Sequence, residues 1–203
     1  MSKISLIFYW VFFAVLNLKA SEYEITVLAT NTANFGGIGE WSFSALLESD
    51  DEKILFDTGF NENTVLHNAN LLGKDLSQVE KVILSHFHGD HTGGLIKLRK
   101  TFKEINPKAF SIVYVADGFF EQRYDENGEL RGFIGGFNDV DNFLKETDDL
   151  GIRFVILKEP IEISKNLYLS GPVERIHERV VVSPGFYLKK DGLLLDDLVL
   201  DDQ

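Results

Sequence analysis

Short apolar runs separated by polar turns dominate the first part of the chain. Residues 23–28 form one such run, and residues 43–48 and 53–56 form a pair divided by the polar residues 49–52. Runs of this length that are rich in β-branched and aromatic residues and bounded by turn residues predict β-strands. The sequence therefore predicts a first strand followed by a hairpin.

From residue 61 onward, helical spacing alternates with short buried strands. Val65, Leu66, Ala69 and Leu72 recur at the spacing of one helix face, and Gly73 supplies a C-terminal stop. This alternation predicts one α/β domain of mixed sheets over residues 21–203. The predicted helices cover residues 61–72, the segment after Gly94 through residue 100, and residues 141–150. The predicted strands cover residues 81–85, 110–115, 153–157, 161–163 and 167–170.

Residues 124–140 contain four glycines and are predicted to form a loop. Two interpretations stay open for its centre, residues 127–136. The loop is a lid over a substrate, as aromatic-bearing loops often are, or it is an ordinary connection that packs on the core. We favour the second interpretation. The aromatic residues around the loop are Phe119, Phe120, Phe133 and Phe137.

The first twenty residues have the layout of a secretory signal peptide. Lys3 precedes the mostly apolar residues 4–16, and the small residues Ala20 and Ser21 follow. A basic start, a short apolar core and a small-residue cleavage site are typical of export. A membrane anchor is the alternative, but a spanning helix needs about 20 apolar residues. We expect cleavage near Ala20, no stable membrane anchor afterwards, and a periplasmic or secreted protein.

Charge and cysteine content narrow the possible functions. The formal net charge is −12, which argues against nucleic acid as a partner because phosphate binding relies on clustered Lys and Arg. The chain has no cysteine, so it offers no disulfide, no thiolate nucleophile and no thiolate ligand. Any metal ion must therefore be bound by His, Asp or Glu, and a small-molecule substrate is the expected partner.

The densest cluster of potential metal ligands is His-Phe-His-Gly-Asp-His, which begins at His86 and holds three of the chain's five histidines. In an extended segment, His86 and His88 point the same way and can share one ion, while Phe87 points into the core. Asp90 and His91 can then turn toward a second position. Imidazole suits zinc, and the carboxylate also tolerates iron or manganese. The density of the cluster disfavours the alternative that these histidines have only surface or packing roles.

Residues 85–94, Ser-His-Phe-His-Gly-Asp-His-Thr-Gly-Gly, resemble the signature of the metallo-β-lactamase fold superfamily. Residues 54–59, Ile-Leu-Phe-Asp-Thr-Gly, resemble the strand-and-aspartate motif that precedes it. The resemblance implies an αβ/βα sandwich and a metal-dependent hydrolase. The segments that resemble the branch related to dihydropterin-ribofuranosylaminobenzene phosphate synthase are residues 66–69, 71–76 and 169–173.

The resemblance also implies roles for individual residues. His86 and His88 would bind a first metal ion, and Asp90 and His91 would bind a second. Asp90 would also orient the catalytic water or accept its proton. Asp57 would support the loop from the end of its strand, although a simple turn-forming aspartate is the alternative there. Zinc is the expected ion, with iron or manganese as alternatives, and the intact family fold holds two ions.

Four side chains do not complete two metal sites. The family supplies a further histidine, a bridging acidic residue and a final histidine from later segments. In this branch they begin soon after a segment that resembles residues 198–203. The remaining histidines are His67, on a predicted helix, and His177, in a charged stretch, and neither is expected to be a ligand. We therefore expect a fold that is incomplete at its C-terminus, with an exposed sheet edge that favours aggregation.

The leading hypothesis is an exported metal-dependent hydrolase acting on phosphoesters, lactones, thioesters or amides, since metal-activated water serves all of them. Pterin biosynthesis itself fits an exported protein poorly. The alternative is a truncated or degenerate metal-binding protein without turnover. A redox protein of this fold that uses two irons is disfavoured by the export signal.

Overall fold

The computed structural model describes residues 23–49, 52–132, 134–137, 139–173, 185–199 and 202–203. The predicted signal peptide, residues 1–20, lies outside these ranges, as do Phe133 and His177. None of the described helices is long and apolar enough to span a membrane.

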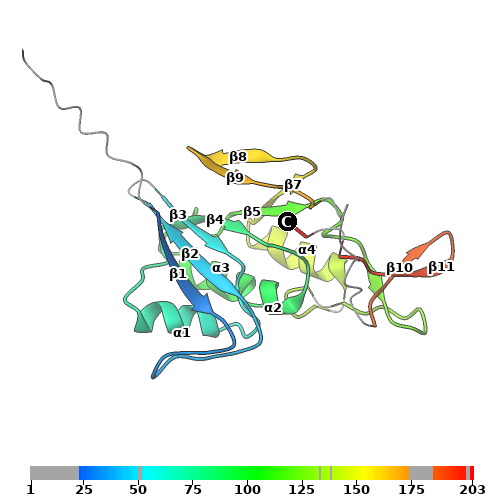
Figure 1. Cartoon of the computed structure of the whole chain (residues 1–203), viewed down its shortest axis with the longest axis horizontal. Coiled ribbons are helices and arrows are strands. Elements are labelled where there is room, and N and C mark those ends of the chain that lie inside the picture. The colour runs from blue at the N-terminus through cyan, green and yellow to red at the C-terminus, as the bar shows by residue number, and fades with distance from the viewer. Residues whose placement is uncertain (1–22, 50–51, 133, 138, 174–184, 200–201) are drawn as a thin grey trace, which may run out of the picture.

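The main sheet is mixed (Figure 1). Its first three strands are antiparallel neighbours, and the remaining pairings are parallel. Parallel neighbours place their carboxyl ends at the same edge of the sheet, where ligands of α/β proteins commonly bind. In spatial order the strands are β1 (Glu24–Ala29), β2 (Ser44–Glu48), β3 (Lys53–Phe56), β4 (Val79–Ile83), β5 (Ile112–Ala116) and β7 (Arg153–Leu157).

Helices cover one face of this sheet, and a hairpin covers the other (Figure 1). Leu55 and Val82 belong to the core beneath the helices, whereas Ile54 and Ile83 pack with the hairpin. Because both faces are buried, residues 54–56 of β3 and the end of β4 are continuous apolar runs. The covering helices are α1 (Thr64–Leu71), α3 (Leu95–Phe102) and α4 (Val140–Asp149), and the hairpin strands are β8 (Ile161–Ser164) and β9 (Leu167–Leu169).

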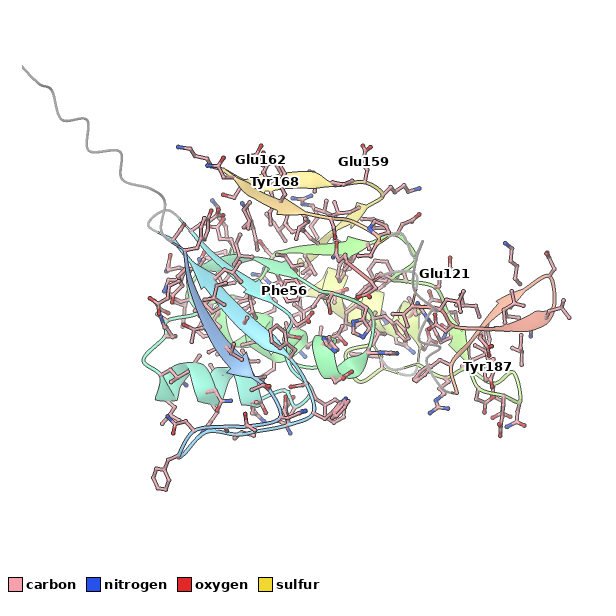
Figure 2. The ribbon with its side chains drawn as sticks, in the orientation of Figure 1. Phe56, Glu121, Glu159, Glu162, Tyr168 and Tyr187 are labelled. Carbon is pink, nitrogen blue, oxygen red and sulfur yellow. The ribbon has the colours of Figure 1, made fainter. Side chains whose placement is uncertain are left out.

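The β8–β9 hairpin presents a polar outer side. Glu162 pairs with Tyr168 across the hairpin, and Figure 2 shows both side chains on the side away from the main sheet. Ile163 and Leu169 point the other way, into the core of the sheet. This is the alternation that a strand pair with one buried face requires.

A second, three-stranded sheet lies beside the main sheet (Figure 1). The apolar pattern did not predict it. A sequence signal was present, because Asp191-Gly192 joins two of its strands as a two-residue turn with φ of 51° and 80°, and Asp-Gly is a strong hairpin signal. The strands, in spatial order, are β11 (Leu193–Asp196), β10 (Tyr187–Lys190) and β6 (Arg123–Tyr124).

The predicted α/β class is confirmed, and the element boundaries move by a few residues. The strand predicted at residues 81–85 is β4, which ends at Ile83 because the chain turns there into the histidine cluster. The loop of residues 127–136 packs on the core: Ile134 is buried, and the Gly135 amide donates to Thr92 Oγ1 at 2.7 Å. For its described residues, the interpretation as a packed connection therefore fits better than a lid.

Candidate metal centre

The histidine cluster lies at the carboxyl ends of β3 and β4. The Asp57 amide, directly after β3, donates to the Ile83 carbonyl at 2.8 Å, so the two strands end side by side. The chain then leaves β4 through bends at residues 85–87 and forms the single helical turn α2 (Gly89–Thr92). This places all the predicted ligands at the edge of the sheet where the parallel strands end.

His86 and His88 face each other, as their spacing predicts. Nε2 of His86 lies 2.8 Å from Nδ1 of His88, and the two ring centroids are 4.6 Å apart. Phe87, between them in sequence, points into the core and is 2% exposed. The bent segment therefore brings two imidazole nitrogens together on one side of the loop.

The α2 turn brings Asp90 and His91 to the same place. The His91 ring centroid is 4.2 Å from that of His86, and His91 Nε2 is 3.5 Å from Asp90 Oδ2. The His91 carbonyl accepts hydrogen bonds from the Thr58 amide at 2.7 Å and from Thr58 Oγ1 at 3.0 Å. The loop after β3 therefore fixes the backbone of α2, and all four predicted ligands lie within one cluster.

Asp57 is buried beneath this cluster at 1% exposure. Its Oδ1 accepts a hydrogen bond from the Ser85 amide at 2.7 Å, and its Oδ2 lies 2.7 Å from His91 Nδ1. Its φ is +55°, a region that few residues other than glycine adopt. The backbone is held there because the Asp57 carbonyl accepts from Ser44 Oγ at 2.7 Å. These contacts exceed what a simple turn-forming aspartate needs.

Ser85 is a site residue to which the sequence assigned no role beyond its place in the motif. Its hydroxyl lies 2.9 Å from Asp57 Oδ2, 3.0 Å from His86 Nδ1 and 3.2 Å from His91 Nδ1. One hydroxyl therefore contacts the back of two imidazole rings and the carboxylate between them. Partners of this kind orient metal-binding histidines and fix their tautomers.

Gln203 is the other contact that sequence reasoning missed. Its amide donates to the Ser85 carbonyl at 3.0 Å, and its Nε2 donates to the Leu84 carbonyl at 2.9 Å. Its Oε1 is buried and accepts no hydrogen bond from the described residues. Gln203 therefore lies against the base of the histidine cluster.

Two glycines of the motif allow close backbone packing at the site. A Cβ on Gly94 would lie 2.2 Å from the Thr58 carbonyl oxygen, and one on Gly93 would lie 2.0 Å from the Phe60 carbonyl oxygen. Neither approach leaves room for a side chain. The pair therefore lets the junction of α2 and α3 contact the loop that follows β3.

Burial and neighbouring charges separate the pKa values of the partly buried His86 and His91 rings. Burial and the nearby imidazoles of His91 and His88 lower the pKa of His86 to about 3. Burial also lowers the pKa of His91, but hydrogen bonds to Asp57 and Asp90 outweigh it and raise that pKa to about 9. Burial raises the pKa of Asp57, against the hydrogen bonds from His91 and Ser85.

The imidazole and carboxylate groups of the cluster are suitable ligands for a divalent transition metal. In this structure these side chains contact mainly one another. Among the described residues, no three His, Cys, Asp or Glu side chains are already arranged around one point for a metal ion. His86 Nε2 and His88 Nδ1 are 2.8 Å apart, whereas two ligands of a tetrahedral zinc ion lie about 3.3 Å apart. A small separation of the two rings is what an ion between them requires.

His67, the remaining histidine among the described residues, does not join the cluster. His67, on α1, places its Nε2 2.7 Å from the Gly36 carbonyl oxygen. Its exposed side chain therefore contacts the long connection between β1 and β2. His177 lies outside the described residues.

The fold and the site define a class of protein. The sequence profile of the metallo-beta-lactamase superfamily matches residues 42–163, which include the candidate centre from Asp57 to His91. The chain belongs to this superfamily, as the motifs predicted. Members of the superfamily generally bind divalent metal ions.

Relatives and solved structures support the predicted branch. Protein MJ0448 of Methanocaldococcus jannaschii is 32% identical over 178 residues, which cover 88% of this chain and 63% of that protein. The 7,8-dihydropterin-6-methyl-4-(beta-D-ribofuranosyl)-aminobenzene-5'-phosphate synthase of the same organism is 27% identical over 199 residues, covering 91% of this chain and 63% of the synthase.

A solved structure agrees with the fold over most of the chain. Tm1679, described as a metal-dependent hydrolase of the beta-lactamase superfamily, superposes with a TM-score of 0.64 and is 28% identical. The match covers 90% of this chain and 60% of that one. The chain therefore spans about three fifths of the length of the relatives it matches.

Proposed function

We propose that this protein is an exported, metal-dependent hydrolase that binds divalent ions, zinc foremost, through His86, His88, Asp90 and His91. One observation carries the proposal: Nε2 of His86 and Nδ1 of His88 face each other at 2.8 Å, with the His91 ring beside them. Three imidazoles and a carboxylate at the carboxyl ends of parallel strands form a donor set typical of hydrolytic metal sites.

In this proposal the residues of the site have different roles. A bound divalent ion supplies Lewis acidity and activates water for attack on the substrate. Asp90, whose carboxylate lies 3.5 Å from His91 Nε2, orients the water and accepts its proton. Asp57 and Ser85 hold the His91 and His86 rings from behind through Nδ1, which leaves each Nε2 directed into the site.

The candidate substrates are phosphoesters, lactones, thioesters and amides, because the same activated water attacks each of them. The synthase of Methanocaldococcus jannaschii is named for a product that carries a 5'-phosphate. That name supports a phosphate-bearing small molecule as the first substrate class to test for this chain. Export is proposed from the basic start and apolar core of residues 1–20.

The second candidate is a metal-binding protein without turnover. It is favoured by the arrangement of the cluster, because among the described residues no three His, Cys, Asp or Glu side chains already surround one point where a metal ion could bind. Under this alternative the chain binds an ion at the cluster but hydrolyses none of the substrate classes.

The test combines metal content, cobalt absorption and a substrate panel. The full chain is purified from a culture fractionated into periplasm and cytoplasm, and its metal content is measured by mass spectrometry. Visible absorption then follows a cobalt(II) titration of the wild type, H88N and H67N. The panel contains a nitrophenyl phosphodiester, a phosphomonoester, a lactone, a thioester and an amide.

We expect the wild type and H67N to bind cobalt(II) alike, because the His67 ring contacts the Gly36 carbonyl oxygen and is not one of the proposed ligands. H88N should bind it more than about 100-fold more weakly. Turnover of a panel member that H88N lacks supports the hydrolase. Metal binding without turnover supports the second candidate, and a wild type that binds no metal refutes both.

A further inference from the structure

Behind the histidine cluster lies a buried ion pair that the proposed chemistry does not use. Arg123, on β6, is 3% exposed, and Asp197, directly after β11, is 0% exposed. Arg123 Nε donates to Asp197 Oδ2 at 3.2 Å, across 74 residues of sequence. The pair joins the two outer strands of the small sheet, whose middle strand carries Tyr187 (Figure 2).

Arg123 contacts Phe87, a residue within the histidine cluster, directly. Its guanidinium carbon lies 3.7 Å from the centroid of the Phe87 ring, a cation–π arrangement. A guanidinium is planar and rigid, so hydrogen bonds at its edge also fix the ring stacked on its face. Nη1 of Arg123 donates to the carbonyl oxygens of Gly118, Phe119 and Glu121.

Asp197 is linked to residues 87 and 88 through Phe186. Its amide donates to the Phe186 carbonyl at 3.1 Å, and its Oδ1 accepts from the Val199 amide at 3.0 Å. The Phe186 ring lies 5.8 Å from Phe87 and 5.5 Å from His88, centroid to centroid. The ion pair is therefore linked to Phe87 through Arg123, and to both Phe87 and His88 through Phe186.

Stability alone does not explain this pair. Burying two charges carries a large desolvation cost, and apolar side chains of similar volume are often as stable in their place. Apolar side chains, however, could not make the hydrogen bonds that fix the orientation of the Arg123 guanidinium. That orientation is transmitted to Phe87, whose ring is 4.4 Å from the His88 ring.

We propose that Arg123 and Asp197 are positioning residues that hold Phe87 and Phe186 against the His88 ring and so keep Nδ1 of His88 turned toward His86. Metal affinity then depends on a contact made by the small sheet. The proposal rests on the proposed function only for the identity of the metal site, because the orientation of His88 is measurable without metal.

Arg99 is a matched control for Arg123. It is also 3% exposed, but it lies on α3 and its guanidinium donates to backbone carbonyl oxygens away from residues 86–91. Loss of Arg99 therefore tests the cost of removing a buried arginine in general. Its carbonyl partners belong to Leu150, Pro107 and Ala109.

The experiment compares the full-length wild type, R123M, the double variant R123M/D197L and R99M. R123M leaves Asp197 buried without its partner and can fail to fold, whereas the double variant removes both charges and is expected to fold. Urea unfolding reports stability, cobalt(II) titration reports affinity and coordination, and the side-chain NMR signals of His88 in the metal-free protein report ring orientation.

We expect R123M/D197L to bind cobalt(II) about 10- to 100-fold more weakly, with altered visible bands and shifted His88 signals but unchanged His67 signals. R99M should lose stability and keep both the affinity and the His88 signals of the wild type. Unchanged His88 signals in the double variant overturn the positioning role. A wild type that binds no cobalt(II) refutes the proposed function instead, and the His88 signals still decide the role of the ion pair.

Discussion

Nδ1 of His91 lies 2.7 Å from Oδ2 of Asp57, a residue 34 positions earlier in the chain. Asp57 follows β3, and His91 lies in the turn that follows β4, so one buried carboxylate joins the ends of two parallel strands. The same carboxylate accepts two hydrogen bonds from Ser85. The histidine cluster is therefore held from beneath by a residue of the neighbouring strand.

Replacing Asp57 should weaken metal binding without unfolding the protein. Asparagine matches aspartate in size and tolerates the positive φ of this position, but it removes the charge beside His91. We expect D57N to bind zinc about 10- to 100-fold more weakly in competition with a chromophoric chelator. D125N, in an exposed turn, is the control, and equal affinity of the two variants would contradict a supporting role for Asp57.

Removing the Ser85 hydroxyl should affect the same site more mildly. S85A leaves Asp57 and the His86 and His91 rings without their shared contact. We expect about 10-fold weaker cobalt(II) binding and a loss of about 1 kcal/mol in the free energy of unfolding. In T147V, which loses a buried hydroxyl bonded to the Phe143 carbonyl, stability should fall while cobalt(II) affinity stays at the wild-type value.

A methyl group on Gly94 should disrupt the junction of α2 and α3. Its Cβ would lie 2.2 Å from the Thr58 carbonyl oxygen, and backbone has to move to relieve that contact. We expect G94A to lose about 3 kcal/mol or more in the free energy of unfolding by urea. G73A meets no neighbouring atom and bears only the cost of its φ of +67°, about 1–2 kcal/mol. The prediction fails if G94A is as stable as G73A.

Glu48, on β2, should make the free energy of unfolding decrease as the pH is lowered. Burial raises the pKa of Glu48, but hydrogen bonds from Lys74 and Lys53 outweigh it and leave the pKa below its ordinary value. Its contribution is therefore present above the pKa of the unfolded chain, about 4.3, and is lost as pH falls through the lower folded pKa. Urea unfolding at a series of acidic pH values should show a shallower loss for E48Q than for the wild type. E104Q, at an exposed position, should keep the wild-type slope.

Features of the site that are local in sequence could be predicted. An extended segment was expected to point His86 and His88 the same way; the two rings do face each other, although the backbone bends at residues 85–87. Phe87 faces the core, as expected. The position of Asp57 near the cluster came from the motif that it shares with the superfamily.

Contacts between distant residues could not be predicted in this way. Nothing near Arg123 in the sequence indicates that it stacks on Phe87 or pairs with Asp197. The hairpin that carries Asp197 was missed as well, because its strands are short and its apolar residues are half exposed, although Asp191-Gly192 marked its turn. The role of Ser85 depends on its contact with Asp57, which is distant in sequence, and it could not be predicted either.

The sequence by itself determined the α/β class, the donor types of the candidate centre and the pairing of His86 with His88. These properties follow from the period of apolar residues and from the reach of a side chain within a few residues. The tertiary structure alone decided that Asp57 lies beneath His91 and that Arg123 and Asp197 lie behind Phe87. Such contacts depend on strand order and register, which the apolar pattern of each strand taken singly does not specify.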